Sequence, residues 1–413
     1  MILIIGAGIS GLTAGRELTL PFKILEKGNT IGGLAGQYPA GPHHFDYGGH
    51  YFHFQKKRRI RRYLNRCHPL VRFTRQSRVF LGETLIPFPI QYHLAFLPHH
   101  LKETVYRELS HATPPSFENL AAHLRSRFGP ALFAHFFQPF LFKYYQTDLT
   151  TLDAGFGGES IPPPDRRKIR GGYRGKIFQK TGYNRFFHYP YGELRAFVDA
   201  YSRPIRSRIH TGQEVLRIDL HRREVFTASG SHSYSALLNT APLSWLLSSI
   251  VQDNFSRLAP KLRSVSTQVV NFVLSRRYQN FHWVYLPSPD IPFYRAGYYP
   301  SSGPVKGYLE RTLAPGSSSK PDDPDMSAAV GTLQKVGMIR EKAEIRFMDS
   351  RVIPVSYVLR DHQWQPTVPA VLRQLKEHRV YSIGRYGSWR YSSMTDDIDQ
   401  ARKTARELNR HGP

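Results

Sequence analysis

The chain has 413 residues, of which 40% are hydrophobic, and this length is enough for two or three domains with real cores. It carries 57 Lys and Arg against 31 Asp and Glu, a formal net charge of +26, and such a field attracts polyanions: nucleic acid, an anionic membrane surface or phosphate-bearing small molecules. The single cysteine, Cys67, excludes an internal disulfide and a cysteine metal site, and no apolar run reaches the roughly 18 residues of a membrane-spanning helix.

The N-terminal stretch ILIIGAGISGLTAGREL predicts an apolar strand, a tight glycine turn and a helix. The spacing Gly6-x-Gly8-x-x-Gly11 lets a pyrophosphate approach the backbone, and the helix N-terminus then faces the phosphates. The next run, FKILEK, predicts a second strand that ends at Glu26, where an acid suits the ribose hydroxyls of a dinucleotide. The pattern fits NAD and FAD equally. The residues expected to contact the dinucleotide are Gly6, Gly8, Ile9, Ser10, Gly11, Glu26 and Lys27.

A second glycine pair lies in the stretch FDYGGHYFHF, residues 45–54, directly before His50 and among five aromatic residues. Paired glycines weaken a strand unless another body approaches the backbone closely. The pair Gly48-Gly49 therefore indicates a ligand against the chain, although His50 can also be read as an ordinary core histidine. No metal site is expected at His50-x-x-His53, because no cysteine or acidic cluster accompanies it.

The densest basic run is QKKRRIRR, residues 55–62. Its plain interpretation is a solvated helix face. Contact with nucleic acid or lipid is the alternative, and no recognition motif in the chain favours either; nucleic acid is not expected as a partner.

The middle of the chain combines helical and β-rich patterns. Residues 116–145 have apolar positions at intervals of three and four, which predict two helices with Ser116 as a cap, and another helix is expected within 92–110. Runs such as TQVVNFVLS and EIRFMDSRVIPVSY predict a mixed or antiparallel sheet that forms the floor of a substrate site. The stretch 313–327 predicts an exposed loop.

Several segments together resemble flavoproteins of the superfamily that contains the amine oxidases and UDP-galactopyranose mutase. They are GGLA after the acidic strand, EVLRIDL, ALLNTAPL and the C-terminal VYSIGRYGSWRYSSMTDDID. In that superfamily they supply the second dinucleotide signature, the adenine side and a helix that meets the flavin, and in the mutases a Gly-Gly-His segment lies against the isoalloxazine ring. The resemblance implies FAD, and the further contacts Gly33, Leu34, Ala35, Gly48, Gly49, His50, Val215, Thr240, Gly384, Arg385, Met394, Thr395 and Ile398.

Cofactor contacts this far apart require an interleaved α/β fold. We expect a Rossmann-type FAD-binding domain built from 1–75, 214–260 and 376–413, a small helical domain at 92–155, and a mixed or antiparallel β-sheet substrate domain built from 76–91, 156–213 and 261–375.

A closer resemblance, to UDP-galactopyranose mutases and especially the eukaryotic type, covers most of the chain. It is carried by LIPFPIQ, GYNRFFHYP, WVYLPSPDIPFYRAGYY, VSYVLRDH and GSWRYSSM. It implies that a nucleotide sugar is bound by Phe88, Gln91, Asn184, Trp283, Tyr285, Arg295, Tyr357 and Tyr391. Aromatic faces suit the base, and tyrosine hydroxyls with an arginine fork suit the two phosphates.

The activity implied by this resemblance is a pyranose–furanose mutase, in which N5 of reduced FAD attacks the anomeric carbon and displaces the nucleoside diphosphate. His50 and Arg295 are then the expected catalytic residues, and NAD(P)H or a reductase is expected to reduce the flavin. An FAD-dependent oxidase or dehydrogenase of the amine oxidase type is the alternative. A flavin-bearing protein without chemistry, serving a partner, is a third.

The chain departs from the mutase pattern at three serines. Ser160 stands where a second diphosphate arginine is usual, Ser302 replaces a tyrosine, and Ser393 replaces an acid of the bacterial enzymes. Arg166, Arg167 or Arg170 could replace the missing arginine, although a solvated loop at 165–176 is an equal interpretation. With one cysteine and a strand at its very start, the chain is expected in the cytoplasm.

Overall fold

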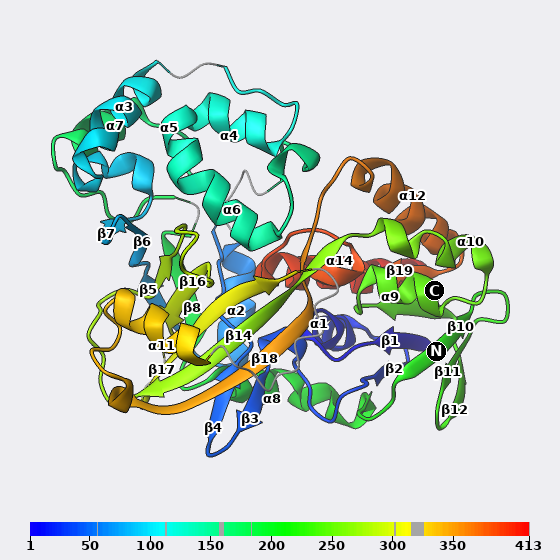
Figure 1. The fold of residues 1–413 in the computed structure, drawn as a ribbon. Coiled ribbons are helices and arrows are strands. Elements are labelled where there is room, and N and C mark those ends of the chain that lie inside the picture. The colour runs from blue at the N-terminus through cyan, green and yellow to red at the C-terminus, as the bar shows by residue number, and fades with distance from the viewer. Residues whose placement is uncertain are drawn as a thin grey trace. The chain divides into compact units, whose positions relative to one another are not determined.

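The computed structural model describes residues 1–55, 57–111, 114–156, 161–182, 184–300, 303–314 and 326–412 (Figure 1). The chain forms two compact units, each assembled from separate stretches. Unit 1 contains residues 1–71, 188–264 and 358–413, and unit 2 contains residues 72–187 and 265–357. The division into three domains expected from the sequence remains a prediction.

A parallel sheet forms the centre of unit 1, with the strand order β19-β13-β1-β2-β9. Its first strand, ILII, is buried along its whole length, and such continuous apolar runs are typical of parallel strands covered on both faces. The five strands are β1 (Ile2–Ile5), β2 (Phe22–Leu25), β9 (Ile209–His210), β13 (Ala236–Asn239) and β19 (Val380–Ser382).

Two helices from opposite ends of the chain pack together in unit 1: α1 (Ile9–Glu17) and α14 (Met394–His411). The carboxylate of Glu17 lies 2.9 Å from Arg402 and 3.1 Å from Arg406, which fixes the end of α1 against α14. The remaining helices are α2 (Arg58–Cys67), α8 (Leu194–Ser202), α9 (Leu243–Ser249), α10 (Asp253–Ser256), α12 (Trp364–Glu377) and α13 (Gly384–Gly387). Two small antiparallel sheets contain β3 (Gln37–Ala40) with β4 (His43–Asp46), and β10 (Val215–Asp219) with β11 (Glu224–Thr227) and β12 (Gly230–Ser233).

Unit 2 is built on a seven-stranded sheet with the order β18-β14-β17-β16-β15-β6-β7. It is mixed, because β15 runs parallel to β6 while its other described pairings are antiparallel. The strands are β6 (Ser77–Leu81), β7 (Thr84–Pro87), β14 (Ser264–Leu274), β15 (Trp283–Tyr285), β16 (Arg295–Tyr298), β17 (Val305–Leu313) and β18 (Ile345–Val358). The boundaries between the units fall at or within β5 (Leu70–Thr74), β8 (Phe186–Pro190), β14 and β18.

The two faces of this sheet differ in chemistry, since successive side chains of a strand point to opposite sides. Val284, Phe272 and Leu309 belong to one face and form a core with Ala329 and Leu333 of α11 (Met326–Lys335). The residues that alternate with them therefore project from the other face.

The remaining helices of unit 2 are α3 (His99–Ser110), α4 (Leu120–Phe128), α5 (Pro130–Leu132), α6 (Gln138–Tyr145) and α7 (Arg166–Tyr173), which gather together in Figure 1. The expected cap Ser116 was wrong: α4 begins later, and the side chain of Asn119 accepts the hydrogen bond from the Ala122 amide at 2.9 Å. Residues 165–176 are not simply a loop, because the Asp165 carboxylate caps α7. Most of the loop expected at 313–327 lies outside the described residues.

The predicted α/β fold class, with its Rossmann-type sheet, helices and large mixed sheet, is confirmed. None of the helices that the structure describes combines the length and apolar character needed to cross a bilayer.

Candidate functional site

The turn between β1 and α1 leaves the start of the helix open to a ligand. The N-terminal residue Gly8 offers no side-chain cap, and the first turn of α1 contains no acidic residue. The first intrahelical amide is that of Leu12, which donates to Gly8 O at 2.9 Å. The earlier N–H groups and the helix dipole together favour an anion such as a pyrophosphate.

Close backbone contacts bring distant segments of unit 1 to this turn. Gly6 has φ +94°, and a Cβ there would lie 2.5 Å from the hydroxyl of Thr240. Gly384 has φ +80°, and a Cβ there would lie 2.4 Å from the hydroxyl of Ser10. Glycine is thus required by both conformation and space at these two positions. Residues near 240 and 384, which the sequence assigned to the cofactor, therefore meet the first glycine loop.

The second glycine signature lies directly against the first. Gly8 and Gly32 form an isolated β-bridge, and the Gly32 amide donates to Ala7 O at 2.8 Å. A Cβ on Gly33 would lie 3.2 Å from the Cα of Gly8. A Cβ on Gly8 itself, by contrast, would meet nothing in the chain closer than 4.0 Å. The chain itself would therefore accept a methyl group at Gly8, and the close approach of a pyrophosphate would account for the glycine there.

Glu26 closes the other side of the turn. Its carboxylate accepts hydrogen bonds from the amides of Ala7 at 2.7 Å and Gly28 at 2.8 Å, and its own carbonyl accepts from Gln213 at 2.8 Å. The last bond brings the β10 segment, which contains Val215, beside the acid. A carboxylate has about four acceptor positions, so Glu26 keeps capacity for the hydroxyls of a ribose.

The Gly48-Gly49-His50 turn follows β4 and lies in the same unit. Gly48 has φ +105°, and the His50 amide donates to Gly48 O at 2.8 Å. The hydroxyl of Thr395, at the start of α14, donates to His53 O at 2.7 Å. The aromatic residues after His50 are partly structural, since Phe52 is buried and packs against Phe197.

The rest of the predicted cofactor set is divided between surface and interior. Arg385 lies with its guanidinium 4.6 Å from the ring of Tyr391, also in unit 1, and Tyr391 is exposed. Val215, Ala35, Thr395 and Ile398 are buried, Lys27 is exposed, and Leu34 and Met394 are half-buried. Ser393 caps α14 through a capping box with Asp396, which also pairs with Lys57.

Asp397, in the first turn of α14, is buried and accepts a hydrogen bond from Ser392 at 2.6 Å. Burial raises the pKa of its carboxyl to about 6, against the partial opposition of Ser392, Arg385 and Arg390. The folded state therefore holds this proton more tightly than the unfolded chain, and stability is lost as pH rises through the interval from the ordinary value of 3.8 to about 6.

We expect Asp397→Asn to remove this cost, which is about 3 kcal/mol for a shift of about two units. The variant should melt at a higher temperature than the parent at pH 8 and at nearly the same temperature at pH 4. Thermal melts at both pH values test this, with Asp399→Asn as the control, because it removes the same charge from the same helix at a half-buried position. Equal pH dependence in parent and Asp397→Asn would contradict the prediction.

In unit 2, three polar residues form one row across the sheet. Tyr285 of β15 lies opposite Arg295 of β16, and Arg295 lies opposite Glu310 of β17. Residues in register on neighbouring strands project from the same face, which here is the face turned away from the α11 core. The alternation of side chains along the strands thus places these three polar residues on the face of the sheet opposite the α11 core.

Arg295 is held by one edge of its guanidinium. Its Nε donates to Glu310, while its two Nη groups form no hydrogen bond to the residues that the structure describes. Its side chain is 18% exposed and that of Glu310 4%. Burial by itself lowers the pKa of Arg295, but Glu310 with Tyr308 and Tyr357 outweighs it and holds that pKa well above the ordinary value. Arg295 is therefore always charged and, among the residues that the structure describes, its two Nη groups remain available to a ligand.

Two further predicted residues, Phe88 and Asn184, connect to this row. The ring of Phe88 lies 5.0 Å from that of Tyr285, and the Arg75 guanidinium lies 5.0 Å from Phe88. Arg75 also donates to the side chain of Asn184 and, at 2.9 Å, to Thr181 O. Phe88, Asn184 and Tyr285 are therefore brought together, with Arg75 as the link.

The other predicted substrate residues of unit 2 have packing partners of their own. Tyr357 lies 4.2 Å from the ring of Tyr144, on α6. Gln91 is buried and donates to Pro162 O at 2.7 Å. Trp283 is 3% exposed and packs against Phe187 at 5.7 Å, the environment of a core residue.

The replacement of the second diphosphate arginine by Arg166, Arg167 or Arg170 remains a prediction. Arg166, Arg167 and Arg170 are all exposed on α7. Ser160 and Ser302 lie outside the described residues.

Two residues of this cluster, Arg75 and Glu310, carried no signal in the sequence. Arg75 precedes an ordinary strand, and its partners lie about a hundred residues later. Glu310 belongs to VKGYLERTL, where a charged residue reads as solvent-facing. Only the register of β16 with β17 reveals its role.

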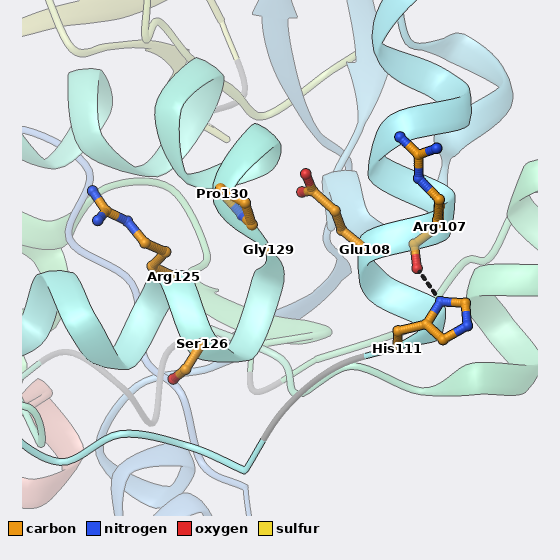
Figure 2. A pocket seen from close by; sticks show the side chains of 7 residues that line it. All are labelled: Arg107, Glu108, His111, Arg125, Ser126, Gly129 and Pro130. Carbon is orange, nitrogen blue, oxygen red and sulfur yellow. Dashed lines mark hydrogen bonds between the residues drawn. The ribbon is translucent and has the colours of Figure 1, made fainter.

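A separate hollow of about 420 Å³ lies among α3, α4 and α5 (Figure 2). Glu108 reaches from α3 toward Gly129 and Pro130, and its carboxylate accepts the Ala131 amide at 2.8 Å. His111 contacts the carbonyl of Arg107 at 2.9 Å. These contacts join helices, and the hollow contains none of the predicted site residues.

Comparison with known proteins supports the dinucleotide turn and the fold. Residues 4–67 match the family described as an NAD(P)-binding Rossmann-like domain. The fold is similar to that of a reduced UDP-galactopyranose mutase, with a TM-score of 0.89 and 21% identity over 98% of this chain and 95% of that one. It is also similar to cyclohexylamine oxidase from Brevibacterium oxydans (TM-score 0.71, 14% identity, 99% and 98% covered) and to a CLA-producing fatty acid isomerase from P. acnes (0.67, 11%, 98% and 98%). The predicted resemblance in fold is confirmed, and this fold accommodates several kinds of chemistry.

Proposed function

We propose that this chain is an FAD-dependent sugar-nucleotide mutase of the UDP-galactopyranose mutase type. The observation that carries the proposal is the unused fork of Arg295 in a row with Tyr285, because a fixed guanidinium with two vacant Nη groups suits the oxygens of a diphosphate. The fold similarity to a UDP-galactopyranose mutase over nearly the whole chain supports the same conclusion.

Unit 1 is proposed to bind FAD. The glycine turn and the open start of α1 receive the pyrophosphate, Glu26 accepts the ribose hydroxyls, and the backbone of Gly48-Gly49 beside His50 contacts the ring system. Bound reduced FAD would supply the nucleophilic nitrogen, N5, for the anomeric carbon of the sugar. NAD(P)H or a reductase is the proposed source of the electrons.

Unit 2 is proposed to bind the nucleotide sugar. The Nη groups of Arg295 hold the diphosphate as it leaves and returns, and Glu310 positions them by engaging Nε. Phe88 and Tyr285 form an aromatic wall for the base, while Arg75 orients Asn184 toward the sugar. Gln91, Trp283 and Tyr357 of unit 2 remain proposed contributors to substrate binding, as does Tyr391, which belongs to unit 1.

An FAD-dependent oxidase of the amine oxidase type is the second candidate, and one observation favours it. Glu310 neutralises the charge of Arg295 within the protein. The row therefore has no net positive charge to attract the two phosphates of a nucleotide sugar. The fold similarity to an amine oxidase fits this alternative equally.

One assay separates the two candidates. We expect dithionite-reduced protein, mixed without oxygen with UDP-galactose and other nucleotide sugars, to yield the furanose isomer with no net consumption of reductant. Oxidised protein should be inactive, since it lacks the nucleophile. Turnover only with oxidised flavin, with net reduction of an acceptor by an amine, would decide for the oxidase.

A further inference from the structure

Helix α2 presents an arginine-rich outer face. Ile60, Tyr63 and Leu64 form its inner side, while Tyr63 packs between Arg16 and Arg402. Its outer side consists of Arg58, Arg59, Arg61, Arg62 and Arg66, all exposed. Within the described part of the chain, none of these five guanidinium groups forms an ion pair.

This arrangement works against the stability of the helix. Arg58, Arg59 and Arg61 occupy the first turn, where the helix dipole is positive, and the first turn contains no acid. Arg58 with Arg62 and Arg62 with Arg66 add like charges four residues apart on one face. A cluster that violates local electrostatics without compensation inside the fold indicates an external anionic partner.

Two exposed hydrophobic residues, Tyr191 and Val71, lie near the C-terminal end of α2. The Tyr191 amide donates to Pro69 O at 3.0 Å, which places Tyr191 next to the residues that follow α2. Tyr191 is 68% exposed and Val71 38%. The side-chain oxygen of Asn65, the one amide residue on the helix, accepts the Leu70 amide at 3.0 Å and so connects the end of α2 to this segment.

We propose that the outer face of α2, with Tyr191 and Val71, binds the surface of an anionic lipid bilayer. Clustered exposed arginines attract acidic headgroups, and a tyrosine with an aliphatic neighbour suits the interfacial layer. An exposed aliphatic side chain beside a tyrosine suits the interfacial layer of a bilayer better than the phosphate backbone of a nucleic acid, and this favours the bilayer. The protein then rests on the membrane peripherally, because α2 buries its apolar side in its own fold.

The test uses the full chain and vesicles of phosphatidylcholine with and without phosphatidylserine. We expect binding only to the vesicles that contain phosphatidylserine, weakening as salt rises. Replacing Arg58, Arg59, Arg61 and Arg62 together by Gln should lower this binding roughly tenfold or more. The matched control replaces Arg203, Arg206, Arg257 and Arg373 by Gln; all four are exposed in unit 1, so it removes the same charge elsewhere and should retain most of the binding.

Folding and specificity are checked with the same proteins. The α2 variant should melt at an equal or higher temperature at low salt, so lost binding does not reflect unfolding. Tyr191→Ser should weaken vesicle binding at raised salt without changing the affinity for a duplex oligonucleotide. The proposal is overturned if the parent ignores phosphatidylserine, if both quadruple variants lose binding equally, or if the oligonucleotide binds more tightly than the vesicles and depends on the same four arginines.

Discussion

Arg295→Ala is expected to lower kcat/KM for a nucleotide sugar by about a hundredfold to ten-thousandfold, because two charge-assisted hydrogen bonds of about 1.5–3 kcal/mol each are lost. FAD should remain bound, since the residue lies in unit 2 and the proposed cofactor residues lie in unit 1. Steady-state kinetics under reducing conditions and the flavin absorbance of the purified variant measure both quantities. A colourless Arg295→Ala protein would show that the residue serves the cofactor.

The same substitution leaves Glu310 buried without its cation, and this costs stability as well as activity. Removing one member of a buried ion pair typically costs about 3–5 kcal/mol. The double variant Arg295→Met, Glu310→Leu replaces both charges by apolar groups of similar size and should recover most of that loss while staying inactive. Recovered activity in the double variant would contradict the proposed phosphate contact, and an unaltered melting temperature in Arg295→Ala would contradict the pairing.

Gly8→Ala is expected to yield a folded protein that purifies without flavin. In the chain itself an added methyl group at this position has space, with the nearest atoms at 4.0 Å. The only demand for glycine there therefore comes from a ligand that approaches the backbone. Absorbance at the flavin band, FAD titration and a thermal melt of the cofactor-free protein test the prediction. Full flavin content in Gly8→Ala would contradict the proposed pyrophosphate position.

Two other glycines give the contrast that this experiment needs. A Cβ on Gly11 would lie 2.0 Å from the carbonyl oxygen of Gly6, so Gly11→Ala should force α1 off β1 and lower the free energy of unfolding by about 3 kcal/mol or more. Gly331, in α11, has no neighbour within 4 Å of such a methyl group, and Gly331→Ala should be neutral or stabilising by up to about 1 kcal/mol. The three variants thus distinguish a glycine required by a ligand, a glycine required by packing within the chain and a glycine that neither requires.

The start of unit 1 could be predicted because its signals are local. An apolar strand, spaced glycines and a terminal acid all lie within residues 2–26, and each reflects a backbone requirement that short sequence can express. The meeting of Gly384 with Ser10 is different. Nothing near either residue indicates the other, and only the resemblance to a known superfamily suggested that the C-terminal segment returns to this turn.

In unit 2, the contacts between the candidate site residues could not be predicted from the sequence. Tyr285 and Arg295 were recognised from a motif, but their shared row with Glu310 depends on the register of three strands, which the sequence does not state. Arg75 was missed because a lone arginine has no pattern, and its partners lie in residues 181–184. The sequence offers a solvated loop at 165–176, whereas the structure has α7 there, with Gly172 packed against the backbone of Tyr92.

The parallel sheet of unit 1 has a consequence for how the protein is made. Its central strand β1 is synthesised before its partner β13, and α1 before α14, whose residues follow almost four hundred positions later. During translation β1 can pair with β2 soon after both are made, while the pairing with β13 and the packing of α1 on α14 must wait for the later segments. A nascent chain that ends before residue 394 therefore lacks the helix against which α1 is fixed in unit 1.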